Sequence, residues 1–357
     1  MSYSENTPSN VKGTIIKKPS LIALAIAGTP NYYRRPQLPY VSSSNHTSIV
    51  IPANTQVNIN DIGYISTSDT IISCSSFTRN GKDIYIYACA PSDSSSTKPT
   101  FVLSLDSTAP SGYTTTTSRK IGGFHCLCAS VGTISGHTLS GYVAGDILPL
   151  SIWDLLHRPV SSPEGMVWVE GLNIWVDIYP TGLSNGNLVS QYGATIADGA
   201  SSPMYHKYRF IEELGKIGKR PSSFTEFVVF AKGSNEGTNI SGSSDPKTCG
   251  GHKDTAGRRM ISNYGIEDCC GAMWYTTISV IKEPNFGNSS WNSQYNSSVD
   301  SQKYGDAYGD IYIIVSGGSW DSGSHCGSRG LTSVTELYAK DANTGCIAVS
   351  PPQIVDF

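Results

Sequence analysis

Short apolar runs separated by polar turns fill the first third of the chain. Runs of roughly four to eight β-branched, aromatic or aliphatic residues between Gly, Asn, Ser and Pro are typical of strands. Asn80-Gly81 predicts a hairpin turn between two of them. The regular spacing of these strands favours a β-sandwich or β-prism region. The predicted strands are 48–52, 55–59, 63–66, 70–74, 83–88 and 101–105.

The pattern changes at about Pro163, where strands alternate with helical segments. Residues 223–232 predict a helix, because Ser222 or Ser223 suits the N-cap and Glu226 falls in its first turn. The other elements predicted here are strands at 165–169, 172–179 and 311–315, a helix at 205–216, a short helix at 151–159 ended by Pro159, and a loop at 263–274 that enters a strand.

The stretch Gly317–Arg329 directly follows a predicted strand and opens with two glycines and a tryptophan. Glycines at the end of a buried strand indicate a place where the backbone approaches a neighbour closely. Residues 330–344 show neither a period of two nor one near 3.6, which predicts an irregular surface segment. A structured anchor followed by a patternless display is typical of a binding loop.

Composition excludes several classes of protein. Only 15% of the 357 residues are charged and the net charge is −3, so nucleic acid and anionic lipid are not expected partners. The longest apolar run, 21–27, is too short to span a membrane. No basic region precedes it, so we expect no signal peptide and synthesis in a reducing cytoplasm. Nine cysteines without a repeating spacing predict buried thiols rather than a disulfide framework.

Candidate catalytic and metal chemistry is sparse. In the segment His125–Cys128, strand alternation places Cys126 and Cys128 on one face and His125 on the other, which does not suit a zinc site. His157 is interpreted as a packing residue. The sequence contains no nucleophile elbow, phosphate loop or H-E-x-x-H motif. We therefore expect no metal, no cofactor and no catalytic residue.

Three ordered blocks resemble a known family. They are Gly218-Lys219-Arg220 before a helix with Glu226 and Phe227, then 263–268 ending in 271–274, and Gly317-Gly318-Ser319-Trp320. This order is similar to the formylglycine-generating-enzyme branch of the C-type lectin fold. The later residues Gly327-Ser328-Arg329 and Gly345 resemble the variable region of proteins diversified by diversity-generating retroelements. Ile347 departs from this pattern, because the family often has Arg there.

The resemblance implies a mainly β fold with an α+β C-terminal domain. The predicted divisions are an N-terminal arm or oligomerisation segment at 1–47, a β-rich domain at 48–160 and a C-type lectin-like domain at 161–357, with a variable region at about 317–350. The implied function is receptor binding at a phage tail fibre tip or on a bacterial cell surface. The ligand would be a host cell-surface protein or glycan, and a homotrimer is the expected assembly because several weak sites raise avidity.

Two other functions stay open. One is a formylglycine-generating-enzyme-like lectin-fold enzyme or its non-catalytic derivative, and the other is a structural tail component. Those enzymes carry two catalytic cysteines five residues apart, and the corresponding positions here are Ser322 and Gly327. Neither residue supplies a thiolate, and Cys326 has no cysteine five residues away.

The resemblance also divides the C-terminal stretch into two kinds of residue. Frame residues are constant and fix the backbone, and display residues vary and contact the ligand. Codons for Gly and Trp contain no adenine in their first two bases, so these residues stay fixed when adenines are mutated. The expected frame residues are Gly317, Gly318, Trp320, Gly327, Arg329 and Gly345. The expected ligand-binding residues, on one exposed patch, are Asp321, Ser322, His325, Thr332, Val334, Thr335, Tyr338, Asp341 and Asn343.

Overall fold

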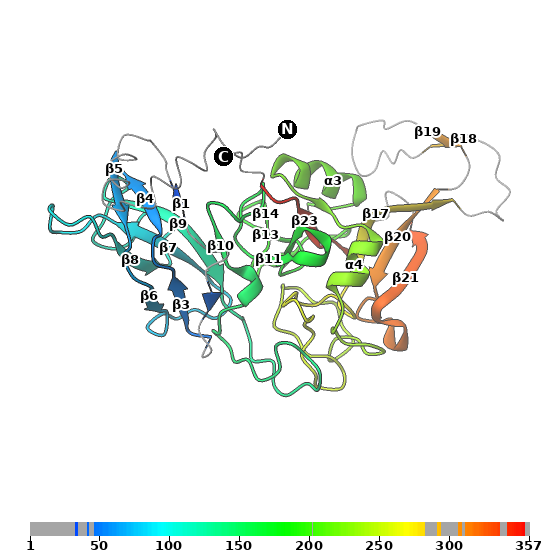
Figure 1. Cartoon of the computed structure of the whole chain (residues 1–357). Helices are drawn as coiled ribbons and strands as arrows, with labels where there is room; N and C mark the ends of the chain where they lie inside the picture. The colour runs from blue at the N-terminus through cyan, green and yellow to red at the C-terminus, as the bar shows by residue number, and fades with distance from the viewer. Residues whose placement is uncertain are drawn as a thin grey trace, which may run out of the picture. The chain divides into compact units, whose positions relative to one another are not determined.

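The computed structural model describes residues 33–34, 41–42, 46–201, 203–282, 291–293, 306–308, 311–335 and 341–353. Strands dominate, and the chain divides into two compact units (Figure 1). The first unit contains Met1–Arg79, Asp83–Phe124 and Ile152–His157, and the second contains Asn80–Lys82, His125–Ser151 and Arg158–Phe357. This division differs from the sequence boundaries, because His125–Ser151 groups with the second unit. Most of the predicted arm lies outside the described residues.

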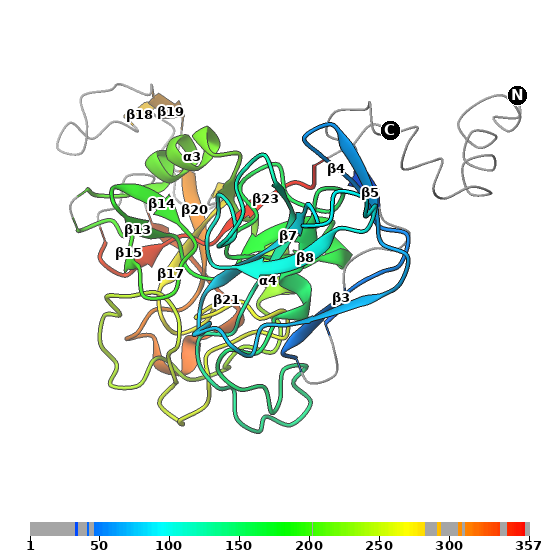
Figure 2. The same ribbon diagram turned by 90° about the vertical axis from the view of Figure 1, so that its left-hand side faces the viewer.

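The first unit is built from the sheets β1-β4-β5, β2-β3-β6 and β10-β9-β7-β8. Figure 2 shows β7 and β8 side by side, and their register pairs Tyr85 with Ser104 and Cys89 with Thr100. The strands are β1 (Tyr33–Arg34), β2 (Val41–Ser42), β3 (Ser48–Ile51), β4 (Gln56–Ile59), β5 (Ile62–Ile65), β6 (Thr70–Ser73), β7 (Asp83–Cys89), β8 (Thr100–Ser104), β9 (Ser118–His125) and β10 (Trp153–Asp154).

Six predicted strands of the first unit are confirmed, from β3 to β8, within one or two residues of their predicted bounds. The predicted hairpin at Asn80-Gly81 is wrong. Gly81 has a positive φ of 63°, but the strands on either side pair elsewhere, β6 with β3 and β7 with β8. The local turn signal was correct, and longer-range pairing decided the partners.

The predicted helix at 151–159 is also wrong. A 3-10 turn, η1 (Pro149–Ser151), is followed by β10, which pairs antiparallel with β9. Gly123 makes this pairing possible, because a Cβ there would lie 2.8 Å from Trp153 Nε1. Close packing of an aromatic ring over a glycine therefore outweighs the local helical pattern.

The second unit contains the sheets β11-β12-β23-β16, β14-β13-β15 and β21-β20-β17-β22, together with two α-helices. Its elements are β11 (Met166–Val169), η2 (Glu170–Leu172), β12 (Ile174–Asp177), β13 (Gly182–Ser184), β14 (Asn187–Val189), β15 (Thr195–Ile196), α3 (Lys207–Lys216), β16 (Arg220–Pro221), α4 (Phe224–Phe230), β17 (Trp274–Lys282), β18 (Trp291–Ser293), β19 (Asp306–Tyr308), β20 (Ile311–Gly317), η3 (Gly323–His325), β21 (Gly327–Thr335), β22 (Thr344–Gly345) and β23 (Ala348–Ser350).

Both predicted helices of the second unit are confirmed as α3 and α4. Ser223 is the N-cap of α4 and forms a capping box with Glu226: its hydroxyl accepts from the Glu226 nitrogen, and the Glu226 carboxylate accepts from the Ser223 nitrogen. Arg220 also pairs with Glu226 at 2.7 Å and 2.9 Å. These contacts fix the start of the helix, which buries Phe227 and Phe230.

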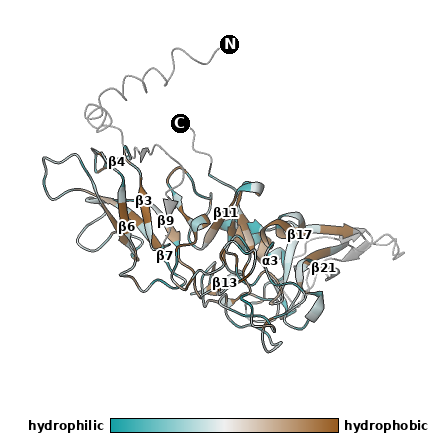
Figure 3. Cartoon of the chain, turned by 60° about the horizontal axis from the view of Figure 1, so that its bottom comes forward, coloured by the Kyte–Doolittle hydropathy of each residue, from teal (hydrophilic) through white to brown (hydrophobic). Residues whose placement is uncertain are grey.

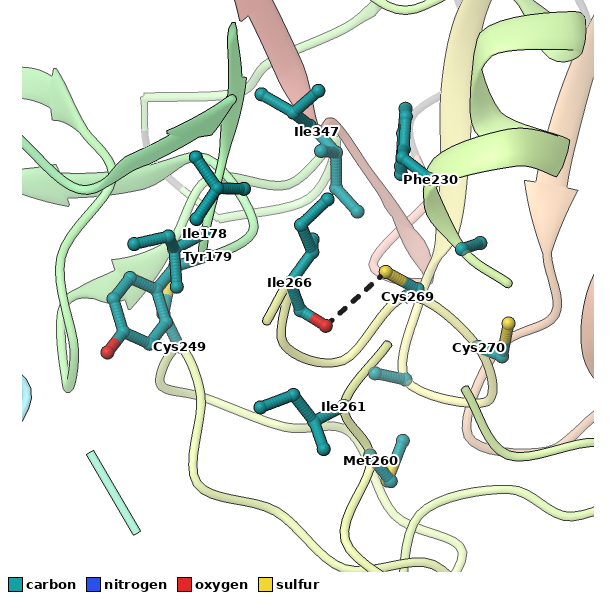
Figure 4. Close-up of a cluster of buried hydrophobic side chains, with 14 of the residues drawn as sticks. Ile178, Tyr179, Phe230, Cys249, Met260, Ile261, Ile266, Cys269, Cys270 and Ile347 are labelled. Atoms are coloured by element: carbon teal, nitrogen blue, oxygen red, sulfur yellow. Dashed lines mark hydrogen bonds between the residues drawn. The ribbon is translucent and has the colours of Figure 1, made fainter. Parts of the chain in front are cut away.

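The core of the second unit lies between its sheets and α4. Figure 4 shows part of it, with Phe230, Ile266, Cys269, Cys270 and Ile347 drawn as sticks. In Figure 3 hydrophobic colour gathers on strands such as β3, β6 and β7, whereas the loops are mostly pale or teal. The nine cysteines are all buried and form no disulfide, as expected. They therefore act as small apolar residues here.

The predicted irregular segment at 330–344 is partly wrong, because its first part belongs to strand β21. This strand pairs antiparallel with β20, and the register shifts between Ile313 and Val315 and again between Ser316 and Gly317. At a sheet edge the ladder is made by the backbone, so a strand needs no apolar alternation there. The hydrophobic pattern therefore gave no signal for β21.

Candidate display surface

Two glycines set the backbone where β20 ends. Gly317 and Gly318 have φ values of 96° and 86°. A Cβ on Gly317 would lie 2.3 Å from the carbonyl oxygen of Cys269, and one on Gly318 would lie 2.8 Å from Cys326 Sγ. Both the left-handed conformation and the close approach favour glycine at these two positions.

The turn that follows is attached to the segment before β17. The Gly271 nitrogen donates to the Gly318 oxygen at 2.9 Å, and the Trp320 nitrogen donates to the Ala272 oxygen at 3.1 Å. The Trp320 oxygen accepts from Asn239 Nδ2. The Trp320 ring is half-buried and packs against the core of the second unit. Trp320, an expected frame residue, therefore contacts the core without being fully buried.

Hydrogen bonds inside the turn involve Ser319, Asp321 and Ser322. Ser319 is fully buried, and its nitrogen donates to Ser322 Oγ at 3.0 Å. The two serine hydroxyls lie 2.9 Å apart, and the Ser319 hydroxyl also donates to Asp321 Oδ1. Ser322 is half-buried with its hydroxyl engaged, whereas the Asp321 side chain is exposed.

A carboxylate from outside the predicted variable region holds the other end of the turn. The two Glu236 carboxylate oxygens lie 3.2 Å and 3.3 Å from the Ser328 nitrogen, and Oε1 accepts from the Ser328 hydroxyl at 2.6 Å. The Gly237 nitrogen donates to the Cys326 oxygen at 2.7 Å. A Cβ on Gly327 would lie 2.1 Å from Glu236 Oε2, so a larger residue there would have to displace this carboxylate.

The loop that carries Glu236 is itself held by polar contacts. Asn239 Nδ2 donates to Ser243 Oγ at 2.9 Å, and Thr238 Oγ1 donates to Asp254 Oδ2 at 2.7 Å. Asn239 and Asp254 are buried. The sequence analysis missed Glu236 and Asn239, because no local pattern indicates a contact with a turn that lies more than eighty positions further along the chain.

Four of the predicted residues lie together in or beside this turn. Asp321, His325 and Arg329 are exposed, and Ser322 lies between them in sequence and is half-buried. Arg329 is expected as a frame residue, but among the described residues no hydrogen bond of its guanidinium is found. We call residues 319–329 the display turn.

The remaining predicted ligand-binding residues lie further along the chain. Thr332 is half-buried on β21. Val334 and Thr335 end the same strand, but their side chains lie outside the described part, and all of Tyr338 does.

Asp341 and Asn343 lie at a different edge of the sheet. They precede β22, which carries Gly345 and pairs parallel with β17. Because the strand order is β21-β20-β17-β22, two strands separate this segment from β21. The Asp341 oxygen accepts from the Gly199 nitrogen at 3.2 Å, and the Asn343 oxygen accepts from the Trp274 nitrogen at 2.7 Å. The strand order therefore does not place them next to the display turn.

Buried ion pairs brace the core segments that support the display turn. Arg259 Nη2 lies 2.7 Å from each Glu267 carboxylate oxygen, with both side chains buried. His252 Nδ1 lies 2.8 Å from Asp268 Oδ2, which also accepts from the Gly250 nitrogen at 2.8 Å. The negative charge of Asp268 raises the pKa of His252 above its usual value. These pairs tie residues 250–259 to the segment that leads into β17.

The display turn carries hydrogen-bonding groups but no activated nucleophile. Cys326 is almost fully buried, and burial raises the pKa of its thiol to about 11. The described residues contain no group of three His, Cys, Asp or Glu side chains that could hold a metal ion. The exposed carboxylate, imidazole and guanidinium of Asp321, His325 and Arg329 can donate to and accept from a bound partner.

The chain is similar in sequence to a known family model and to a known phage protein. Residues 39–154 match the family model of the Mtd second domain. The tail fiber receptor-binding protein of Bordetella phage BPP-1 is 32% identical over 243 residues, which are 63% of this chain and 61% of that protein. This alignment thus spans less than two thirds of the relative's length.

Solved structures extend the similarity over most of the chain. The P3c variant of the Major Tropism Determinant superposes with a TM-score of 0.75 at 27% identity, covering 91% of this chain and 87% of that one. The U1 variant gives a TM-score of 0.75 at 26% identity with the same coverage. The resemblance to retroelement-diversified variable proteins is thereby confirmed. Residues 39–154 thus resemble the Mtd second domain, and the chain has the C-type lectin fold of the Major Tropism Determinant, which it resembles in sequence and in structure.

Proposed function

We propose that this chain is a receptor-binding protein of a phage tail fibre and that the display turn forms part of its binding surface. The names of its relatives support this function. The observation that carries it is the combination of a tightly held backbone with exposed polar side chains. Such an arrangement lets side chains change while the backbone keeps one shape.

In this proposal the frame consists of residues whose replacement would disturb the backbone. Gly317, Gly318 and Gly327 are included because a Cβ on each would collide with a neighbour. Ser322 joins the frame, since its hydroxyl is used inside the turn. Asp321, His325 and Arg329 belong to the display, and Thr332 on β21 extends it.

The proposed partner is a protein or glycan on the host cell surface, and the proposed location is the virion. A homotrimer fits this function, because linked copies of one weak site gain avidity without any new contact. We propose no catalytic activity, since the positions of the two catalytic cysteines are occupied by Ser322 and Gly327. Among the described residues, no helix is long and apolar enough to cross a membrane.

Competition with the phage tests this function. Purified full-length protein is added to host bacteria before phage particles that carry the same protein, and free phage is counted after adsorption. The protein should reduce adsorption in proportion to the fraction of cells that it coats. If it binds the cells no better than an unrelated protein of similar charge and leaves adsorption unchanged, the receptor-binding function is wrong.

A further inference from the structure

A cavity of about 450 Å³ lies in the second unit and plays no part in the proposed function. Three separate segments supply its walls: the loop before η1 with the first two residues of η1, Lys232 shortly after α4, and the turn at 263–264. Its volume falls in the range of roughly 300 to 1,000 Å³ that is typical of small-molecule sites. Its lining residues are Thr138, Leu139, Tyr142, Leu148, Pro149, Leu150, Lys232, Asn263 and Tyr264. We call it the Tyr142 pocket.

Hydrogen bonds between the three segments preform the pocket. The Thr138 hydroxyl donates to the backbone oxygen of Asn263 at 2.5 Å. The backbone nitrogen of Asn263 donates to the backbone oxygen of Lys232 at 2.9 Å. Leu139 and Leu148 are buried and belong to the core, and Gly265 allows Leu148 to pack closely, since a Cβ there would lie 3.2 Å from Leu148 Cδ2. A ligand would therefore meet a fixed apolar lining.

The polar groups of the lining favour an anion. Lys232 is exposed and makes no ion pair among the described residues. Asn263 Oδ1 lies 3.4 Å from the Thr138 nitrogen, whereas its Nδ2 has no acceptor in the described part of the chain. The pocket lining contains no carboxylate. Lining residues that carry an ammonium and a side-chain amide, set beside apolar side chains, match a ligand with an apolar body and one negative head group.

We propose that the Tyr142 pocket binds a small amphipathic carboxylate. Its alkyl or aromatic body packs against Leu139, Leu148 and Tyr142, and its carboxylate lies at Lys232 and Asn263. The recognised chemistry, one negative head group on an apolar chain, is shared by a free carboxylate and by an anionic lipid of the host surface. The proposal does not depend on the receptor-binding function.

Binding of sodium octanoate to the full-length protein tests this proposal, with acetate and octanol as matched probes. Ligand-detected NMR should show octanoate bound and acetate unbound, and saturating octanoate should raise the melting temperature by mass action. Lys232→Ala should weaken octanoate binding at least fivefold and leave octanol binding unchanged. Lys216→Ala, an exposed lysine on α3, should change neither.

A second variant tests the location. Leu150 is 37% exposed, so Leu150→Trp should fill the pocket without unfolding the protein and abolish the octanoate signal. Vesicles of phosphatidylglycerol form a further arm: displacement of octanoate by vesicles would assign the ligand to a lipid, and no displacement would assign it to a free carboxylate. Octanoate binding that survives in Leu150→Trp, or that equals octanol binding in the parent, would overturn the proposal.

Discussion

The carboxylate of Glu236 accepts a hydrogen bond from the Ser328 nitrogen over 3.2 Å, although 92 positions separate the two residues. The acceptor is on a loop outside the predicted variable stretch and the donor is a backbone group. A bond to the backbone is independent of the side chain at position 328. Glu236 can therefore hold the start of β21 in one place whatever residue is displayed there.

Replacing Glu236 should loosen the display turn without unfolding the protein. We expect Glu236→Ala to speed amide hydrogen exchange at Ser328 at least tenfold. The free energy of unfolding should change by no more than about 1 kcal/mol, because the glutamate is exposed. Ser328→Ala keeps the N–H and should preserve most of the protection. Equal exchange rates at Ser328 in the parent and in Glu236→Ala would show that the Glu236 carboxylate does not stabilise the backbone at Ser328.

Two glycines of the same stretch should respond very differently to alanine. At Gly317 an added Cβ would lie 2.3 Å from a backbone oxygen, whereas at Gly323 it would meet nothing within 4 Å. Both have positive φ, so both variants carry a conformational cost of about 1 to 2 kcal/mol. Gly317→Ala should lose at least about 3 kcal/mol in total. Denaturant unfolding checks this order, and equal losses would mean that the close approach is not needed.

The His252–Asp268 pair should make stability depend on pH. Asp268 raises the pKa of His252 above 6.5, so the stability gained from this pair is complete below pH 6.5 and is lost as the pH rises through the folded-state pKa. Two other charged groups also act on this histidine: Glu267 raises its pKa further, and Arg259 lowers it. His252→Gln should therefore cost most stability below pH 6.5 and least in alkaline solution.

Comparing the parent protein with His252→Gln at each pH isolates the contribution of the His252–Asp268 pair to stability. Burial lowers the pKa of His137, so this histidine makes stability depend on pH in the opposite direction. The parent and His252→Gln both contain His137, so its contribution cancels in the comparison. The measurement is the difference between their free energies of unfolding from pH 5.5 to 9. A difference that grows as the pH rises would contradict the assigned pair.

Local signals in the sequence predicted much of the fold. The capping box of Ser223 and Glu226 depends on residues three positions apart, and short apolar runs mark the strands from β3 to β8. Signals of this kind failed where distant pairing decides the outcome. Trp153 joins β9 because Gly123 leaves room for its ring, and neither residue alone indicates the other.

The candidate site was predictable to a similar degree. Paired glycines and the tryptophan at 317–320 predicted a close approach, which the contact of Gly317 with Cys269 explains. The supports at Glu236 and Asn239 were not predictable, since both reach the turn across long stretches of chain. The separation of Asn343 from β21 also follows only from the strand order.

The central claim is that exposed side chains of the display turn contact the receptor while the frame fixes the backbone. The most direct test measures binding of labelled full-length protein to bacteria that the parent protein coats. The variants compared are the double variant His325→Ala/Arg329→Ala and the control Glu213→Ala/Lys216→Ala, which removes an ion pair on α3. The account predicts that each exposed substitution costs at most about 0.5 kcal/mol of stability, that the display variant loses at least tenfold in affinity, and that the control binds like the parent. Parental affinity in the display variant, or an equal loss in the control, would contradict it.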